Sequence, residues 1–490
     1  DRWPHRLGAM PRRRITLPSV PAPLREGFRT LAEQLEIPGE FPPEVLAEAS
    51  QVAASGPVDG VHREDFTDLG FITIDPASST DLDQAMYIER DGDGYRVHYA
   101  IADVAAWVPP GGAIDAEARS RGLTHYAPGW RIPLHPQVLS EKAGSLLADG
   151  TPRPALVWQM DLDADGEVRS WDLRRGMVIN RSKLDYMGVQ AAIERGTDLT
   201  TLKLLREVGE CRQRIEAERG GVSLGIPEQE VVADGDKWRL EFRTPLAVEG
   251  WNAQISLMTG MCAARTMLEA GVGVLRTLPP ADERDINRLR LTAGSLGLDW
   301  PADVGYPQFV RSLDASCPAD QAMMNACITL FRGAGYTLIT GDRSQKATWH
   351  AAMAAPYAHV TAPLRRLVDR FVGQVCVEVI AGREIPDWLT EGLASMPELM
   401  TEADRRAKKF ERGIVSLAEA LVLGERIGDR FDATVVDVDN RSPERVVVSL
   451  SEVAVEIPAS GSGIELGSVV RVRIEAVNPR SGEVKAVVER

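Results

Sequence analysis

The pattern of hydrophobic and polar residues predicts a sheet near the start of the chain. Residues 71–74 and 85–88 are short apolar runs rich in β-branched and aromatic side chains, which predicts two buried strands. An Asp-Gly-Asp-Gly segment at 91–94 separates the second run from an alternating run at 95–102. Asp-Gly between two such runs predicts a β-hairpin. The same signals predict another hairpin over 157–179.

Between residues 185 and 427 the apolar residues recur with helical spacing instead. Helices are predicted over residues 185–220, 248–271, 284–297, 318–335, 363–381 and 396–423. Together with the predicted strands, these helices indicate an α+β body in which helices surround a central sheet.

The two ends of the chain differ from this body. From residue 428 onward, five short segments rich in β-branched residues match a five-stranded OB-type barrel. Arg471 and Arg473 on one of its strands are candidate phosphate contacts, or ordinary outward-facing residues. At the other end, an amphipathic pattern and a proline-started segment predict a short helical element. We therefore predict three units, at residues 1–65, 66–427 and 428–490.

Composition and charge limit which compartment and which binding partners are expected. The chain has no apolar run of about 18 residues, so we expect no membrane span. Its first residues lack the apolar segment of a secretory signal, and its five cysteines contain no Cys-x-x-Cys pair, which favours a reducing cytoplasm over a disulfide or zinc framework. The net charge of −15 argues against nucleic-acid binding over the whole surface. A nucleic-acid partner would have to meet a local basic lining.

Three aspartates follow the first predicted strand. Pro76 ends that strand after Asp75, and the small residues that follow would bend the chain so that Asp81 and Asp83 approach Asp75. Crowded carboxylates require a shared cation or proton, and oxygen ligands without His or Cys favour Mg²⁺ or Mn²⁺. The alternative is a solvated turn in which Thr80 and Asp83 cap a helix. The two-residue alternation of the flanking runs disfavours that alternative.

Residues 73–83, Thr-Ile-Asp-Pro-Ala-Ser-Ser-Thr-Asp-Leu-Asp, resemble the metal-site signature of the ribonuclease II / ribonuclease R family, the RNB-domain exoribonucleases. The similarity continues at residues 100–104, 126–129 and 357–366, and it covers roughly residues 40–425. The barrel that follows resembles the S-one-type domain that ends this family. Family members usually carry two cold-shock-like barrels before the catalytic domain, and we expect these to be lacking here.

The resemblance implies a metal-dependent 3′→5′ exoribonuclease. Such an enzyme hydrolyses single-stranded RNA to nucleoside 5′-monophosphates and leaves a short oligomer, with Mg²⁺ as the cofactor and Mn²⁺ as the alternative. Asp75, Asp81 and Asp83 resemble three of the family's four metal-site aspartates. Gln84 stands at the fourth position, so the site is one negative charge short. Arg365 resembles the arginine that the family aims at the scissile phosphate, which its planar fork suits.

Further RNA-contacting residues are implied in the same way. Tyr126 resembles the tyrosine that stacks on the 3′-terminal base; the alternative is a half-buried loop aromatic. Arg366 is a candidate RNA contact that would otherwise face a carboxylate or the backbone. Glu411 resembles a helix glutamate near the catalytic centre, with a solvated charged face as the alternative. His350 and His359 are expected to be structural.

Three functions remain open at this point. The first is the exoribonuclease, a monomer acting on single-stranded RNA in the cytoplasm. The second is a catalytically weakened RNA-binding protein of the same fold, which Gln84 keeps possible and Arg365 argues against. The third is a carboxylate-metal phosphodiesterase that acts on DNA or small nucleotides.

Overall fold

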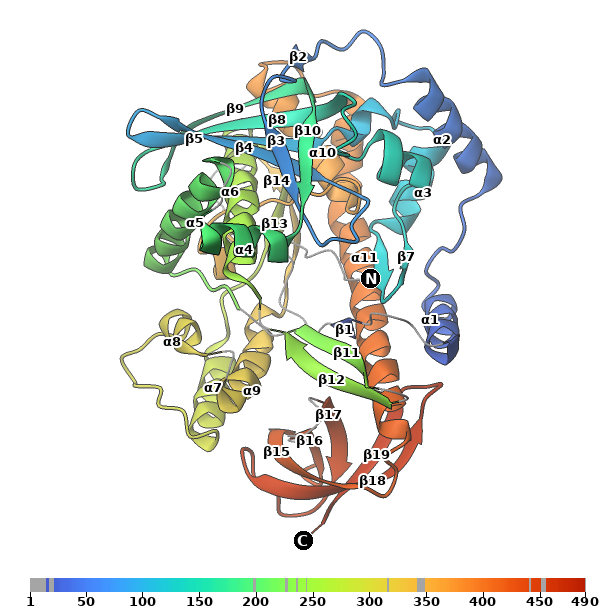
Figure 1. Cartoon of the computed structure of the whole chain (residues 1–490), viewed down its shortest axis with the longest axis vertical. Helices are drawn as coiled ribbons and strands as arrows, with labels where there is room; N and C mark the ends of the chain where they lie inside the picture. The colour runs from blue at the N-terminus through green and yellow to red at the C-terminus, as the bar shows by residue number, and fades with distance from the viewer. Residues whose placement is uncertain are drawn as a thin grey trace.

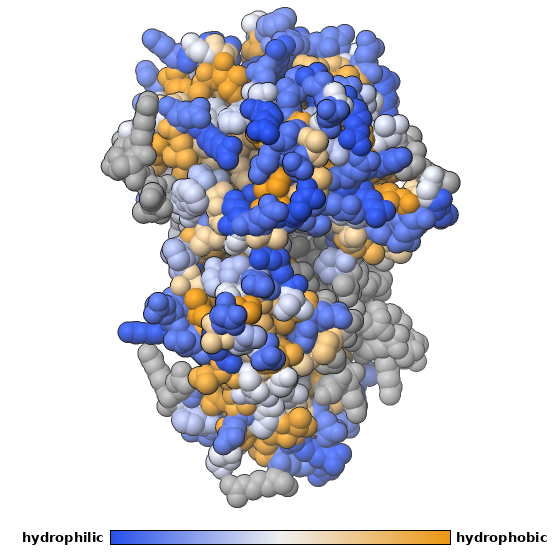
Figure 2. Space-filling model, turned by 90° about the vertical axis from the view of Figure 1, so that its left-hand side faces the viewer, coloured by the Kyte–Doolittle hydropathy of each residue, from blue (hydrophilic) through white to orange (hydrophobic). Residues whose placement is uncertain are grey.

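The computed structural model describes residues 15–16, 22–196, 200–224, 228–234, 237–243, 245–314, 317–341, 349–439, 442–450 and 455–489. An α+β body lies at one end of the molecule and a barrel at the other, and helix α11 (Asp387–Gly424) runs between them (Figure 1). No helix in these ranges is long and apolar enough to cross a membrane. On the face drawn in Figure 2, hydrophobic residues form small groups separated by hydrophilic ones.

The body is built on a seven-stranded sheet in the order β10-β3-β4-β5-β8-β9-β2. These strands are β2 (Glu64–Asp65), β3 (Phe71–Ile74), β4 (Gln84–Asp91), β5 (Gly94–Ala102), β8 (Arg153–Leu162), β9 (Val168–Val178) and β10 (Asn180–Leu184). β4 and β5 pair antiparallel up to Asp91 and Gly94, and β8 pairs antiparallel with β9. Gly92 and Gly166 take positive φ angles of 58° and 86° in the two connecting turns. Both predicted hairpins are confirmed.

Helices cover this sheet on both sides. They are α2 (Pro43–Ser55), α3 (Ala113–Arg121), α4 (Tyr186–Arg195), α5 (Thr200–Arg219), α6 (Ala247–Ala270) and α10 (Leu367–Ile380). One core joins sheet residues such as Tyr99 and Trp158 to Met258 of α6 and Phe371 of α10. A second core joins Phe71 and its neighbours to α2 and α3. The α+β prediction is therefore confirmed.

One helix boundary differs from the prediction in a way that affects the site. The helix predicted over 363–381 begins only at Leu367, because Arg366 has extended backbone angles (φ −135°, ψ 125°). The Asp369 carboxylate accepts a hydrogen bond of 2.7 Å from the Ala362 amide, which holds the preceding segment as a loop. Residues 361–366 are therefore free to turn towards the sheet.

The remaining elements lie outside the seven-stranded sheet and the barrel. They are β1 (Ile15–Thr16), α1 (Ala22–Gln34), β6 (His125–Ala127), β7 (Trp130–Ile132), β11 (Glu228–Asp234), β12 (Lys237–Arg243), β13 (Val272–Thr277), α7 (Glu283–Ser295), α8 (Tyr306–Ser312), α9 (Pro318–Cys327) and β14 (Gly335–Thr340). Helix α1 packs along α11, and β1 pairs in parallel with β11 (Figure 1). Helices α7 to α9 share their own core, in which the Trp300 and Phe309 rings stack at 4.1 Å.

The barrel is closed by five strands in the order β15-β16-β17-β19-β18. They are β15 (Arg430–Val438), β16 (Arg445–Leu450), β17 (Val455–Ser460), β18 (Val469–Asn478) and β19 (Glu483–Glu489). Alternate residues along these strands point inwards, as the buried Phe431, Ala433 and Val435 of β15 show. The predicted five-stranded OB-type barrel is confirmed.

Candidate active site

The loop of residues 75–83 leaves β3 and returns to β4, as predicted. The Lys183 ammonium donates a hydrogen bond of 2.8 Å to the Ala77 carbonyl oxygen. The Ser145 hydroxyl accepts a hydrogen bond from the Leu82 amide and donates one to the Thr80 carbonyl oxygen, both at 2.9 Å. These contacts fix the backbone from which the three aspartates project.

Asp83 meets the second predicted motif. Its Oδ1 accepts a hydrogen bond of 2.7 Å from the Leu364 amide, and its Oδ2 lies 3.2 Å from Nε of Arg365. Only 3% of Asp83 and 4% of Arg365 are exposed. Two segments far apart in the sequence therefore meet at one buried contact between a carboxyl group and a guanidinium, which places Arg365 beside the aspartate loop.

Arg366 is directed elsewhere. Its Nε and Nη2 donate hydrogen bonds of 2.8 and 2.7 Å to the two carboxylate oxygens of Asp369, and both side chains are buried. This bidentate pair holds the start of α10. The geometry thus favours a carboxylate partner for Arg366 over the predicted contact with RNA.

Asp81 is held by the hairpin β6–β7. The Tyr126 hydroxyl donates to Asp81 Oδ2 at 3.1 Å, and Arg131 Nη1 donates to Asp81 Oδ1 at 2.7 Å. Arg131 Nη2 also lies 2.5 Å from Glu141 Oε1. Tyr126 is therefore a buried partner of the aspartate loop, closer to the half-buried aromatic alternative than to an open stacking platform. The sequence interpretation missed Arg131 and Glu141, because their only signal is a contact made in three dimensions.

The three carboxylates influence one another. Burial raises the pKa of Asp75 to about 7 and the pKa of Asp83 to about 8. The Arg365 charge opposes both increases, whereas the Asp81 charge adds to them. The Asp81 charge therefore acts on both buried carboxyls, and at neutral pH Asp75 and Asp83 are stabilised by a bound proton or cation.

Two oxygen atoms at this site are suited to a cation. Asp75 Oδ2 and Gln84 Oε1 are buried and have no hydrogen-bond partner among the described residues. Buried polar atoms are normally satisfied, and oxygen donors are the ligands that Mg²⁺ prefers. The described residues contain no group of three or more His, Cys, Asp or Glu already arranged around a metal position, since arginines hold Asp81 and Asp83. The donor types therefore fit Mg²⁺ or Mn²⁺. Asp75 Oδ2 and Gln84 Oε1 are the oxygens without a hydrogen-bond partner in the described ranges, so they are the most available to a cation.

The other predicted site residues have different surroundings. Glu411 is partly buried on α11, next to Phe410, whose ring lies 6.1 Å from that of His125 on the hairpin. His359 Nδ1 lies 2.9 Å from the Tyr336 hydroxyl. Burial lowers the pKa of His350 to about 3, so its ring is neutral. The two histidines fit the structural role expected for them.

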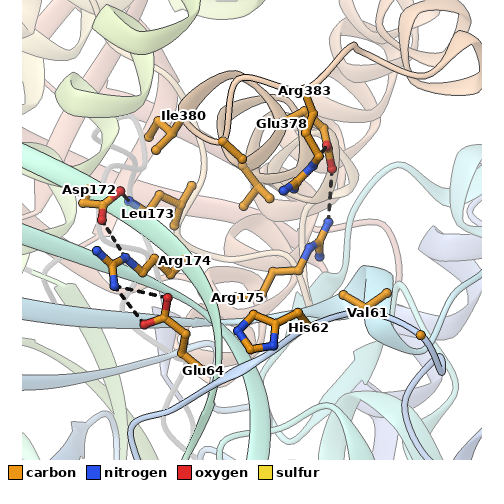
Figure 3. Close-up of a pocket in the computed structure, with 13 residues that line it drawn as sticks. Val61, His62, Glu64, Asp172, Leu173, Arg174, Arg175, Glu378, Ile380 and Arg383 are labelled. Atoms are coloured by element: carbon orange, nitrogen blue, oxygen red, sulfur yellow. Dashed lines mark hydrogen bonds and ion pairs between the residues drawn. The ribbon is translucent and has the colours of Figure 1, made fainter.

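A separate cavity lies away from these residues, between β9 and the end of α10 (Figure 3). Its arginines are paired with carboxylates: Arg174 lies 2.9 Å from Glu64, and Arg175 lies 3.6 Å from Glu378. It includes none of the predicted site residues. Its balanced charges make it a weaker candidate for nucleic-acid chemistry than the aspartate loop.

On the barrel, the two candidate phosphate contacts also have acidic neighbours. Arg471 Nε lies 3.8 Å from Asp432, and Arg473 Nε lies 2.9 Å from Glu489. The Phe431 side chain is completely buried and cannot stack on a base. The barrel strands thus offer a charge-balanced surface in these places.

Comparison with known proteins identifies the family. The RNB domain profile matches residues 63–381, and the profile of the RNase II-type exonuclease C-terminal S1 domain matches residues 429–489. The first match covers more than half of the chain, so the protein belongs to the RNB-domain family.

Individual relatives agree with this assignment. The chain is 28% identical over 403 residues to exoribonuclease 2 of Cronobacter sakazakii, covering 78% of this chain and 60% of the relative. It is 24% identical over 435 residues to ribonuclease R of Aquifex aeolicus, covering 83% of this chain and 59% of the relative. It thus spans about 60% of the length of these relatives.

A solved structure shows the same fold. The structure of Mycoplasma genitalium RNase R in complex with ribose-methylated single-stranded RNA superimposes with a TM-score of 0.83 and 19% identity. The match covers 96% of this chain and 78% of the RNase R chain.

Proposed function

We propose that this protein is a metal-dependent 3′→5′ exoribonuclease that hydrolyses single-stranded RNA to nucleoside 5′-monophosphates and leaves a short oligomer. One observation carries the proposal: the buried pair of Asp83 and Arg365 joins the aspartate loop to the arginine motif inside an RNB domain. The relatives named exoribonuclease 2 and ribonuclease R support it, as does the RNA-bound structure with the same fold.

The roles of the side chains follow from the contacts. Asp75, Asp81, Asp83 and Gln84 would hold the divalent cation, which activates water and neutralises charge on the phosphate oxygens when bound. Arg365 would orient the scissile phosphate. Its Nε lies 3.2 Å from Asp83, and the planar guanidinium fork fits phosphate oxygens.

Contacts within the protein also hold the aspartate side chains in position before substrate binds. The Leu364 amide orients the Asp83 carboxylate, and the Tyr126 hydroxyl orients Asp81. Preorganised groups need little rearrangement as negative charge develops on the phosphate. If Tyr126 contacts the 3′-terminal base as the family resemblance implies, its ring would make that contact while its hydroxyl remains hydrogen-bonded to Asp81.

The proposal is tested with 5′-labelled single-stranded RNA and DNA of the same sequence, each incubated with Mg²⁺, Mn²⁺ or EDTA. We expect the RNA to shorten stepwise to a short oligomer with either metal, and to remain intact in EDTA. The released product should be the nucleoside 5′-monophosphate. Equal degradation of the DNA would instead select a carboxylate-metal phosphodiesterase of broader specificity.

A catalytically weakened RNA-binding protein is the second candidate. Gln84 favours it, because an amide oxygen binds a hard cation without contributing charge. RNA binding without shortening in any metal would select this candidate. For the active protein we propose a monomer in the cytoplasm; light scattering of the purified chain tests the first of these two points.

A further inference from the structure

Arg131, the central residue of β7, is paired with Tyr126 in the hairpin β6–β7 and is a cation at the aspartate loop that no motif predicted. Its guanidinium lies 2.7 Å from Asp81 and 2.5 Å from Glu141, and Nη2 also donates a hydrogen bond to the Thr80 hydroxyl. Its side chain is 23% exposed and that of Asp81 is 6% exposed. The pair is thus largely shielded from water, where opposite charges interact more strongly than on an open surface.

Arg131 changes which oxygens of the loop are open to a cation. Both carboxylate oxygens of Asp81 are engaged, since Tyr126 donates to Oδ2 while Arg131 donates to Oδ1. Asp75 Oδ2 and Gln84 Oε1, in contrast, are buried without a hydrogen-bond partner in the described ranges. The charge of Asp81 is therefore already balanced by a cation that belongs to the protein.

We propose that Arg131 is a positioning residue that acts as the resident counter-cation of Asp81 and thereby lowers the affinity of the aspartate loop for divalent cations. This inference rests on the proposed function, because it concerns the same carboxylates. It goes further by assigning a regulator of metal affinity to a side chain outside the loop.

Replacing Arg131 could change the divalent-cation affinity in two ways: it removes a positive charge, and it removes a contact that holds Asp81 in position. Other contacts also hold Asp81 in position. The Ser145 hydroxyl hydrogen-bonds the Leu82 amide and the Thr80 carbonyl oxygen, and the Tyr126 hydroxyl donates to Asp81. Loss of the guanidinium should therefore leave Asp81 nearly in place. The main change is that a positive charge no longer opposes the incoming cation.

The test compares Arg131→Gln, which removes the charge but keeps a hydrogen-bond donor, with Arg131→Lys, which keeps the charge. Mn²⁺ binding to metal-stripped protein is measured without RNA, by calorimetry and by electron paramagnetic resonance of free Mn²⁺. We expect Arg131→Gln to bind Mn²⁺ about tenfold more tightly than wild type, because one nearby positive charge has been lost. Arg131→Lys should remain close to wild type.

Arg169→Gln is the matched control, since Arg169 is exposed and pairs with Asp163 in the turn between β8 and β9. It should not change Mn²⁺ binding. Equal or weaker Mn²⁺ binding by Arg131→Gln, in a wild type that does bind Mn²⁺, overturns the inference and leaves the proposed function standing. Absence of Mn²⁺ binding in all the proteins, with intact RNA, overturns both.

A second variant covers the case in which Arg131→Gln does not fold. Glu141→Gln removes the negative charge that faces Arg131, so the surroundings of Asp81 become more positive. Mn²⁺ binding should become weaker than in wild type. Unchanged or tighter binding by Glu141→Gln contradicts the inference. Thermal unfolding in EDTA shows whether each variant is folded.

Discussion

In the metal-free protein, the free energy of unfolding should fall as pH rises from 5 to 7, and Asp83→Asn should remove much of that pH dependence. The carboxyl is almost fully buried, and burial raises its pKa from 3.8 to about 8. The folded protein therefore holds a proton that the unfolded chain releases. A group of this kind lowers the free energy of unfolding as pH rises between its two pKa values.

The magnitude follows from the size of the pKa shift. Between pH 5 and pH 7 the unfolded chain has an ionised Asp83 while the folded protein has a protonated one, which costs about 1.4 kcal/mol per pH unit. Over this interval the metal-free wild type should lose about 3 kcal/mol relative to Asp83→Asn. The neutral amide can still accept the Leu364 hydrogen bond, so that contact is retained.

The assay is urea unfolding at several pH values, in EDTA and in excess Mg²⁺. In EDTA the stability of wild type should fall more steeply with pH than that of Asp83→Asn. In Mg²⁺ wild type should gain more stability than Asp83→Asn, because a cation bound only to the folded state at about a thousand times its Kd adds about 4 kcal/mol. Parallel pH curves in EDTA, or no gain from Mg²⁺ in wild type, would refute the reasoning.

Three further substitutions test single contacts. Arg365→Lys should keep RNA binding but lower kcat about tenfold or more, measured at saturating RNA, because a point charge cannot replace the guanidinium fork; an unchanged kcat contradicts the assignment. Tyr126→Ala should change the length of the final oligomer, seen on a sequencing gel, whereas Tyr126→Phe should keep that length and lose only the hydrogen bond to Asp81. Arg366→Ala should lower the free energy of unfolding by about 3–5 kcal/mol in a urea titration, because it leaves Asp369 charged and buried; a change below about 1 kcal/mol would mean that the pair is not structural.

Local patterns predicted much of the fold. The sequence predicted the strand at 71–74, the loop after it and the hairpin at Asp91–Gly94. Apolar alternation and Asp-Gly turns can be recognised from residues that are adjacent in the sequence. The closed barrel followed from similar local signals. Helix α11 was predicted too short, since it begins at Asp387 and contains Pro397 within its length. Pro397 lies inside the helix, and buried residues on both sides of it, Leu393 and Met400, belong to the core of the body.

The candidate site was only partly predictable. The approach of Asp75, Asp81 and Asp83 followed from the bend after β3, whereas the meeting of Asp83 with Arg365 came from the family resemblance alone. No periodicity indicates that Arg131, fifty residues after Asp81, would pair with it. Such contacts depend on how separate elements pack, and single-sequence patterns carry little information about that.

The central claim is that the aspartate loop and Arg365 act together on the 3′ end of RNA. The most direct measurement is a single-turnover reaction of 5′-labelled RNA in Mg²⁺ with wild type and Asp83→Asn, together with the Kd of each protein for the same RNA. We predict that wild type shortens the RNA one nucleotide at a time from its 3′ end, while Asp83→Asn binds it with similar affinity and leaves it intact. Equal shortening by both proteins, or internal cuts in the RNA, would contradict the account.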